Sequence, residues 1–207
     1  RTALTCAGRR GKARPGYEVT IVEPGTARPV PPESPGEIVV DMKIHNIVMR
    51  AYYGMQEKTA EDFRNRKLHT GDLGRMDEDG YFYFMDRVKD YIRRRGENVS
   101  SMEVERQASD HPNIREAAAI GVKAGEGASS EDEIMIVCIP EGDAPDPVEY
   151  THWMAERMPY FMVPRYIRFV DTLPKTPTER VQKVKLRDEG ITADTFDREV
   201  AGIQVKR

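Results

Sequence analysis

The chain has 207 residues, and its 32 lysines and arginines against 35 aspartates and glutamates give a formal net charge of −3. This balance argues against a general nucleic-acid-binding protein, and no apolar run approaches the ~20 residues that a membrane span requires. Cys6 and Cys138 provide no disulfide framework and the four histidines lack metal-ligand spacing, so we expect a cytoplasmic protein without a metal site.

The first third of the chain is predicted to form short strands separated by turns. Residues 17–22 alternate in polarity and lie between two Pro-Gly pairs, a pattern typical of a strand. Further strands are predicted at residues 36–40 and 81–85, with loops at 1–14 and 29–36, a short helix at 59–66 and a hairpin turn at 77–80. Residues 81–85 carry bulky side chains on both faces and are expected to be buried. Residues 1–86 are therefore predicted to form a β-rich subdomain.

Residues 86–90 interrupt the apolar pattern with alternating charges and are predicted to contain a domain boundary. Beyond it, Ser100 and Glu103 form a capping box at the start of one helix, and Asp146 and Pro147 start another. Strands are predicted at residues 114–122, 133–139 and 166–170, with a flexible loop at 125–130 and a polar segment after residue 173. Residues 87–207 are therefore predicted to form an α+β domain, a few-stranded sheet covered by helices.

Several residues of this second domain are predicted to be structural. One helix face carries large apolar side chains at helical spacing, which indicates core packing; they are Tyr150, Trp153, Met154 and Met158. Cys138 lies in a β-branched strand without a neighbouring base, so we expect a buried small hydrophobe and not a nucleophile. The acidic residues 131–133 are interpreted as a charged loop edge and not as a metal site.

Residues 70–72 read Thr-Gly-Asp and form the first stretch with a chemical signature. A turn glycine lets the backbone approach a ligand closely. Ionised Asp72 only accepts hydrogen bonds, and its two oxygens match two vicinal hydroxyls of a ribose. The alternative is a turn aspartate that bonds to its own backbone.

Residues 87–90 read Arg-Val-Lys-Asp and form the second stretch. Arg87 offers a planar fork of donors that suits ribose or phosphate oxygens. For these four residues in isolation, a solvated surface patch is the favoured interpretation.

Residues 93–98 form the third stretch and concentrate three arginines at a glycine turn, where the backbone can come near a ligand. The alternative is an exposed basic hairpin. Arg94 in particular is expected to point away from any site.

The order and spacing of these stretches, from His69 to Val99, resemble the adenylate-forming superfamily of acyl-CoA synthetases, luciferases and the adenylation domains of peptide synthetases. The resemblance implies that Asp72 grips the ATP ribose, that Arg87 contacts the nucleotide, and that Lys89 is the hinge between two domains. It also implies nucleotide contacts during adenylation for Arg93 and Asn98, and a role in thioester formation for Arg95 and Gly96. Gly96 would leave room for the pantetheine arm of CoA.

Residues 173–183 resemble the last motif of this family, a proline-lysine-threonine run that ends in Gly-Lys. The family's lysine bridges the carboxylate substrate and the α-phosphate, but Glu179 and Arg180 occupy the Gly-Lys positions here. Arg180 can substitute through its fixed charge, although a planar, bulkier arginine is not a conservative exchange. Alternatively, Lys183 or Lys175 reaches in, or adenylation is impaired and only thioester chemistry survives.

The resemblance implies the C-terminal portion of an ATP-dependent acyl-CoA ligase, an acid-thiol ligase, with crotonobetaine/carnitine-CoA ligases as the nearest type. Such an enzyme converts a carboxylic acid, ATP with Mg²⁺, and CoA into acyl-CoA, AMP and pyrophosphate through an acyl-adenylate. The phosphate loop and the acyl pocket are expected in an N-terminal part of the same protein, so the chain alone is expected to be inactive. The alternatives are a carrier-protein-loading adenylation domain and a non-catalytic remnant.

Overall fold

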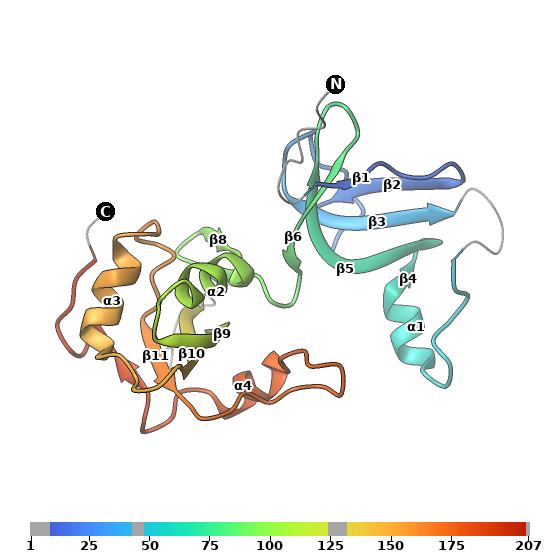
Figure 1. Ribbon diagram of the computed structural model, residues 1–207. Coiled ribbons are helices and arrows are strands. Elements are labelled where there is room, and N and C mark those ends of the chain that lie inside the picture. Colours follow the sequence, from blue (N-terminus) through green and yellow to red (C-terminus); the bar gives the residue numbers. More distant parts are fainter. Residues whose placement is uncertain (1–8, 43–47, 124–131, 206–207) are drawn as a thin grey trace. The chain divides into compact units, whose positions relative to one another are not determined.

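The polypeptide divides between Lys89 and Asp90 into two units, each built on its own sheet (Figure 1). The computed structural model describes residues 9–42, 48–123 and 132–205. Cys6, the loop predicted at 125–130 and most of the loop predicted at 1–14 lie outside the described residues, and residues 9–11 form a strand instead of a loop. Helices and strands occur in both units, so the α+β fold class is confirmed. Among the described residues, no helix combines the length and the apolar character that crossing a membrane requires.

The described residues of the first unit form a six-stranded antiparallel sheet in the order β1-β6-β5-β3-β2, with β4 paired to β5. The strands are β1 (Arg9–Gly11), β2 (Tyr17–Val22), β3 (Gly36–Met42), β4 (Phe63–Arg64), β5 (Lys67–Met76) and β6 (Phe82–Arg87), and α1 (Gln56–Asp62) precedes β4. The strands predicted at 17–22 and 36–40 and the hairpin turn at 77–80 are confirmed. Within that turn the Tyr81 N–H donates to Asp77 Oδ1 at 2.8 Å, and Gly80 has the positive φ of 80°.

Two predictions for this unit are wrong in detail. The helix ends at Asp62 instead of residue 66, because the chain turns back through Asn65 and Arg66, with φ of 53° and 64°, to pair β4 with β5. The aromatic strand is half-buried and not buried. It lies beside the three-residue strand β1, which covers little of its length.

The described residues of the second unit form a four-stranded sheet in the order β12-β11-β10-β9 and a separate β7–β8 hairpin. The elements are β7 (Ile92–Arg94), β8 (Glu97–Val99), α2 (Ser101–Ser109), β9 (Ile114–Val122), β10 (Glu133–Pro140), α3 (Pro147–Ala155), β11 (Tyr166–Phe169), α4 (Lys183–Glu189) and β12 (Phe196–Asp197). The strands predicted at 114–122, 133–139 and 166–170 are confirmed to within one residue. β10 runs antiparallel to β9 and parallel to β11, and α3 lies in the crossover that a parallel pair requires.

Both predicted helix starts of this unit are confirmed. The Ser100 hydroxyl accepts a hydrogen bond from the Glu103 N–H at 3.4 Å, and Asp146 Oδ1 accepts one from the Val148 N–H at 2.9 Å. By contrast, the sequence-based prediction lacks α4, which follows residue 173. This helix buries only Leu186 and has no side-chain hydrogen bond at its N-cap, so it carries neither a clear apolar face nor a start signal.

The core of the second unit lies on both faces of β10. Alternate residues of this strand divide between two apolar clusters: Ile134, Ile136 and Cys138 pack with α2 and α3, and Met135, Val137 and Ile139 pack with Leu186 of α4. The apolar face predicted for α3 lies in the first cluster, where Tyr150 and Met154 are buried and Trp153 is half-buried. A strand covered on both faces explains why this segment reads as a continuous apolar run.

Cys138 is expected to resist thiol reagents in the folded protein. Its side chain is fully buried, and burial raises the pKa of the thiol to about 12. At pH 8 the reactive thiolate is then on the order of one molecule in 10⁴. We expect iodoacetamide to label Cys138 only after unfolding in guanidinium, as checked by peptide mapping that scores Cys6 separately. Equal labelling rates at Cys138 in the native and the unfolded protein would contradict the buried position.

Candidate functional site

Asp72 and Arg87 lie side by side in the first unit, as register partners of β5 and β6. Arg87 Nε is 3.3 Å from Asp72 Oδ1, and both side chains reach solvent. Among the described residues, the Asp72 carboxylate accepts no hydrogen bond from its own backbone; instead the Asp72 N–H donates to Thr70 Oγ1 at 3.1 Å. Asp72 Oδ1 is buried and makes no hydrogen bond among the described residues, while the Asp72 side chain as a whole is 33% exposed and that of Arg87 is 60% exposed. The pair therefore keeps hydrogen-bonding capacity for a polar ligand.

Residues 70–72, expected from sequence as a turn, lie within β5 where its register against β3 shifts. Two buried residues that the sequence-based prediction missed hold this segment. Glu37 Oε2 lies 2.9 Å from His69 Nδ1, and Glu37 Oε1 accepts a hydrogen bond from the Gly71 N–H at 3.2 Å. Gly71 has a φ of 69°, which glycine adopts without strain. The signal available in the sequence was a glutamate inside an apolar strand, since a buried carboxylate requires partners. A hollow of about 410 Å³ beside this segment of β5 is lined by Thr70, Gly71, Arg87, Lys89, Lys58 and Asp62, among others.

The β7–β8 hairpin presents Arg93 and Asn98 to solvent as register partners. Its two-residue turn consists of Arg95 and Gly96, with φ of 51° and 79°. Positive φ at both positions is the geometry that closes a tight hairpin. A Cβ on Gly96 would meet no described atom within 4 Å, so the glycine serves its backbone conformation and leaves the space beside it open.

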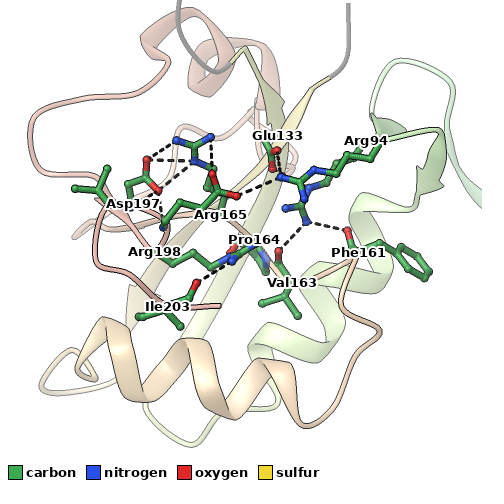
Figure 2. A network of polar contacts seen from close by, with 12 residues as sticks. Arg94, Glu133, Phe161, Val163, Pro164, Arg165, Asp197, Arg198 and Ile203 are labelled. Carbon is green, nitrogen blue, oxygen red and sulfur yellow. Dashed lines mark hydrogen bonds and ion pairs between the residues drawn. The ribbon is translucent and has the colours of Figure 1, made fainter. Parts of the chain in front are cut away.

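Arg94 lies on the face of β7 opposite Arg93, as expected for a residue that points away from the candidate site. It is buried, however, so the exposed-hairpin alternative is wrong for Arg94. The residue is only 1% exposed. Arg94 Nε lies 2.7 Å from Glu133 Oε2, and Nη1 donates to the carbonyls of Phe161 and Val163 at 2.9 and 3.0 Å (Figure 2). Burial lowers the pKa of the Arg94 guanidinium, and the adjacent carboxylate opposes that change. Strand alternation gives the reason, because Ile92 faces the core and its neighbour two residues on must do the same.

Arg95, at the tip of the hairpin, is 61% exposed but already has two acidic partners. Its Nη2 lies 3.3 Å from Glu133 Oε1 and 3.2 Å from Glu199 Oε1. Residues 131–133, interpreted from sequence as a charged loop edge, thus include Glu133, which begins β10 and binds both arginines; residue 131 lies outside the described residues.

The candidate cations of residues 173–183 differ in how they are held. Lys183 is 13% exposed, and its Nζ lies 2.6 Å from Glu105 Oε1 and 2.7 Å from Ser101 Oγ. Lys175 Nζ lies 2.8 Å from Glu116 Oε2. Arg180 is exposed, and its guanidinium has no hydrogen-bond or ion-pair partner among the described residues. Of the three cations, Arg180 is the one that can meet a ligand without first breaking an ion pair.

Glu179 is expected to strain the loop that carries Arg180. Its φ is 61°, where glycine is favoured and other residues lose roughly 1–2 kcal/mol. We therefore expect Glu179→Gly to raise the free energy of unfolding of the second unit by about 0.5–1 kcal/mol, after the unfolded-state entropy of glycine is subtracted. The check is guanidinium unfolding followed by fluorescence of Trp153, the single tryptophan of the chain.

Glu179→Ala is the matched control for this change. It also removes the exposed Lys175–Glu179 ion pair at 3.6 Å but keeps a Cβ at the left-handed position. Alanine should therefore leave stability within about 0.5 kcal/mol of the parent protein. An equal gain from alanine and glycine would mean that strain is not the cause.

The candidate residues form separate groups in the structure. Asp72 and Arg87 form one pair, while the hairpin groups Arg93, Asn98, Arg95 and Gly96. In the described part of the second unit, no hydrogen bond or ion pair joins Arg180 to that hairpin. Within the described residues, no three His, Cys, Asp or Glu side chains are placed to hold a metal ion.

Comparisons with known proteins indicate the family of this chain. Residues 103–180 match the family model of the AMP-binding enzyme C-terminal domain. The chain is 32% identical over 178 residues to a fatty acid–[acyl-carrier-protein] ligase of Streptomyces coeruleorubidus, covering 86% of this chain and 33% of that protein. It is 36% identical over 165 residues to a feruloyl-CoA synthase of an Amycolatopsis species, covering 78% of this chain and 32% of that protein.

Solved structures indicate the same family. ATP-bound MatB of Rhodopseudomonas palustris matches 88% of this chain and 35% of its own, with a TM-score of 0.73 at 31% identity. The o-succinylbenzoate-CoA synthetase of Bacillus subtilis, bound to its acyl-adenylate, gives a TM-score of 0.74 at 28% identity, over 87% of this chain and 36% of its own. The chain spans about one third of the length of the relatives that it matches. It therefore belongs to the adenylate-forming superfamily, as a C-terminal portion that carries the AMP-binding enzyme C-terminal domain.

Proposed function

We propose that the chain is the C-terminal portion of an ATP-dependent acyl-CoA ligase. The observation that carries this proposal is the Asp72–Arg87 pair, a half-buried carboxylate and an exposed guanidinium. Arg87 also lines the hollow that Thr70 and Gly71 line. A carboxylate with free acceptor capacity suits ribose hydroxyls, and a neighbouring guanidinium suits ribose or phosphate oxygens. The type of acid, including the crotonobetaine/carnitine type, stays a prediction.

The proposed reaction has two steps. In the first, a carboxylate oxygen of the acid attacks the α-phosphorus of ATP, the bond to pyrophosphate breaks, and an acyl-adenylate forms. Arg180 would stabilise the charge that develops on the phosphoryl oxygens, and Mg²⁺ would enter with the ATP phosphates. In the second step the CoA thiol loses its proton and its sulfur attacks the acyl carbonyl, so that AMP leaves with the bonding electrons.

The division of the chain at residues 89 and 90 supports the proposed hinge at Lys89. A hinge residue must absorb a large change in φ and ψ while the elements on either side stay packed. We propose that the predicted domain of residues 1–86, extended through Arg87 to the hinge at Lys89, completes the large adenylating domain, and that the residues beyond Lys89 turn as one body. One orientation would bring Arg93, Asn98 and Arg180 to the nucleotide, and the other would bring the Arg95–Gly96 turn to CoA.

A carrier protein is the second candidate acceptor. One of the relatives named above is a fatty acid–[acyl-carrier-protein] ligase, whereas the other is a CoA synthase. Both acceptors present a thiol on a pantetheine arm, and the space beside Gly96 suits either arm. We propose CoA as the acceptor. We also propose the cytoplasm as the compartment.

The test uses the protein that joins this chain to a large adenylating domain. A panel of carboxylic acids is screened for acid-dependent ATP–pyrophosphate exchange, and the active acid is then supplied with CoA or with a phosphopantetheinylated carrier protein. We expect exchange with at least one acid, and thioester formation on CoA. Exchange followed by transfer to the carrier protein alone would identify a loading domain. A lack of exchange with every acid would favour a non-catalytic remnant.

A further inference from the structure

The Arg94–Glu133 pair is a buried charge pair that the proposed chemistry does not use. Arg94 is 1% exposed and contacts the Glu133 carboxylate and two backbone carbonyls, of Phe161 and Val163 (Figure 2). Desolvation of such a pair offsets most of its attraction, so apolar side chains of similar volume would serve stability equally well. Because this pair adds little net stability, its two charges are better explained by the geometry that they fix.

Glu133 connects the buried arginine to the tip of the hairpin. Its Oε2 lies 2.7 Å from Arg94 Nε, and its Oε1 lies 3.3 Å from Arg95 Nη2. One carboxylate, fixed at the first residue of β10, therefore binds two consecutive arginines, the last residue of β7 and the first residue of the turn. Glu199 holds Arg95 from another direction at 3.2 Å.

Backbone bonds secure the base of the hairpin. β7 and β8 pair over three residues each, and the Asp132 N–H donates to the Arg93 carbonyl at 2.9 Å. The turn lies beyond this short ladder, and Arg95 has a φ of 51°, a conformation that a non-glycine residue adopts at a cost. The carboxylates that bind Arg94 and Arg95 add contacts that anchor the turn to the start of β10 and to Glu199.

We propose that Arg94 and Glu133 are positioning residues that set the pose of the Arg95–Gly96 turn for thioester formation. This inference rests on the proposed function. Two carboxylates already bind Arg95, although each is shared with a second arginine: Glu133 with Arg94, and Glu199 with Arg165. The part of Arg95 is therefore to hold the backbone of Gly96 beside the pantetheine arm and not to offer a free cation to a phosphate. Arg93 and Asn98 keep their ladder pairing without Glu133, so adenylation depends on the pair far less than acyl transfer does.

The first test needs no activity and uses the 207-residue chain. Glu133→Gln keeps the size of the side chain but removes the charge that binds both arginines. We expect amide hydrogen exchange of the hairpin, residues 92–99, to accelerate at least tenfold while β9 is unchanged. Asp132→Asn is the matched control, since its carboxylate pairs with Lys123 at 2.7 Å and its backbone bond to Arg93 is kept. Unchanged exchange in the hairpin of Glu133→Gln would overturn the inference.

The second test measures the two half-reactions of the protein that includes the adenylating domain. Glu133→Gln should raise the KM for CoA or lower single-turnover transfer from the acyl-adenylate at least tenfold, with ATP–pyrophosphate exchange lowered less than threefold. Asp132→Asn should change neither. Equal losses in both half-reactions would assign the pair a merely structural role and overturn the proposal. A parent protein without exchange would refute the proposed function, while hydrogen exchange still decides whether the pair fixes the turn.

Discussion

Replacing Arg180 with alanine is expected to lower acid-dependent ATP–pyrophosphate exchange by about 10²–10³-fold. This is the range found when one preorganised group that stabilises transition-state charge is removed. Arg180 is exposed on a loop after Glu179, and its guanidinium has no ion-pair partner among the described residues. The measurement is initial-rate exchange at saturating ATP in the protein that includes the adenylating domain, with circular dichroism to confirm the fold.

Lysine substitutions in the same segment separate Arg180 from its competitors. Lys183 would have to leave Glu105 and Ser101, and Lys175 would have to leave Glu116, before either could reach a nucleotide. We therefore expect Lys175→Met and Lys183→Met to retain exchange within about threefold. Exchange that survives Arg180→Ala but collapses in Lys183→Met would transfer the role to Lys183.

Arg180→Lys tests whether charge or shape is required. A lysine restores the family's residue type at this position, but it offers a point charge in place of a planar fork. Recovery of at least tenfold relative to Arg180→Ala would indicate an electrostatic role. A variant no better than alanine would mean that this loop has adapted to the guanidinium.

Regular patterns in the sequence predicted much of the fold. The strand at residues 17–22 and the helix start at Asp146 were accessible because alternation, Pro-Gly pairs and an N-cap act locally. The helix α4 was not, because burial of Leu186 alone depends on a sheet that other segments build. Local helix propensity carries no information about this packing, because β10 lies about 50 residues before α4 in the chain.

In the candidate site, too, local sequence signals predict some features and only tertiary contacts determine others. The closeness of Asp72 and Arg87 follows from a hairpin closed at residues 77–80, so a local turn signal places both residues. The position of Arg94 followed from alternation after Ile92 but was overlooked, because a run of three arginines suggests solvent. Its partners Glu133, Phe161 and Val163 are 39 to 69 residues away, and only tertiary structure identifies them.

Replacing Arg94 with methionine is expected to lower the free energy of unfolding of the second unit by about 3–5 kcal/mol. Removal of one partner leaves the Glu133 charge with only the exposed Arg95 and strips two carbonyls of their donor. Guanidinium unfolding followed by Trp153 fluorescence reports this unit, because Trp153 packs against the core cluster that contains Ile92 and Met154.

Arg94→Met combined with Glu133→Leu separates the cost of an unpaired charge from the value of the pair. An apolar pair of similar volume avoids desolvation of either ion, so the double variant should regain more than half of the stability lost in Arg94→Met. A loss below about 1 kcal/mol in the single variant would contradict burial of the pair. One informative outcome is a double variant that regains stability while amide hydrogen exchange in its hairpin stays fast. In that case the charges at residues 94 and 133 are needed to position the turn and are not needed to stabilise the core.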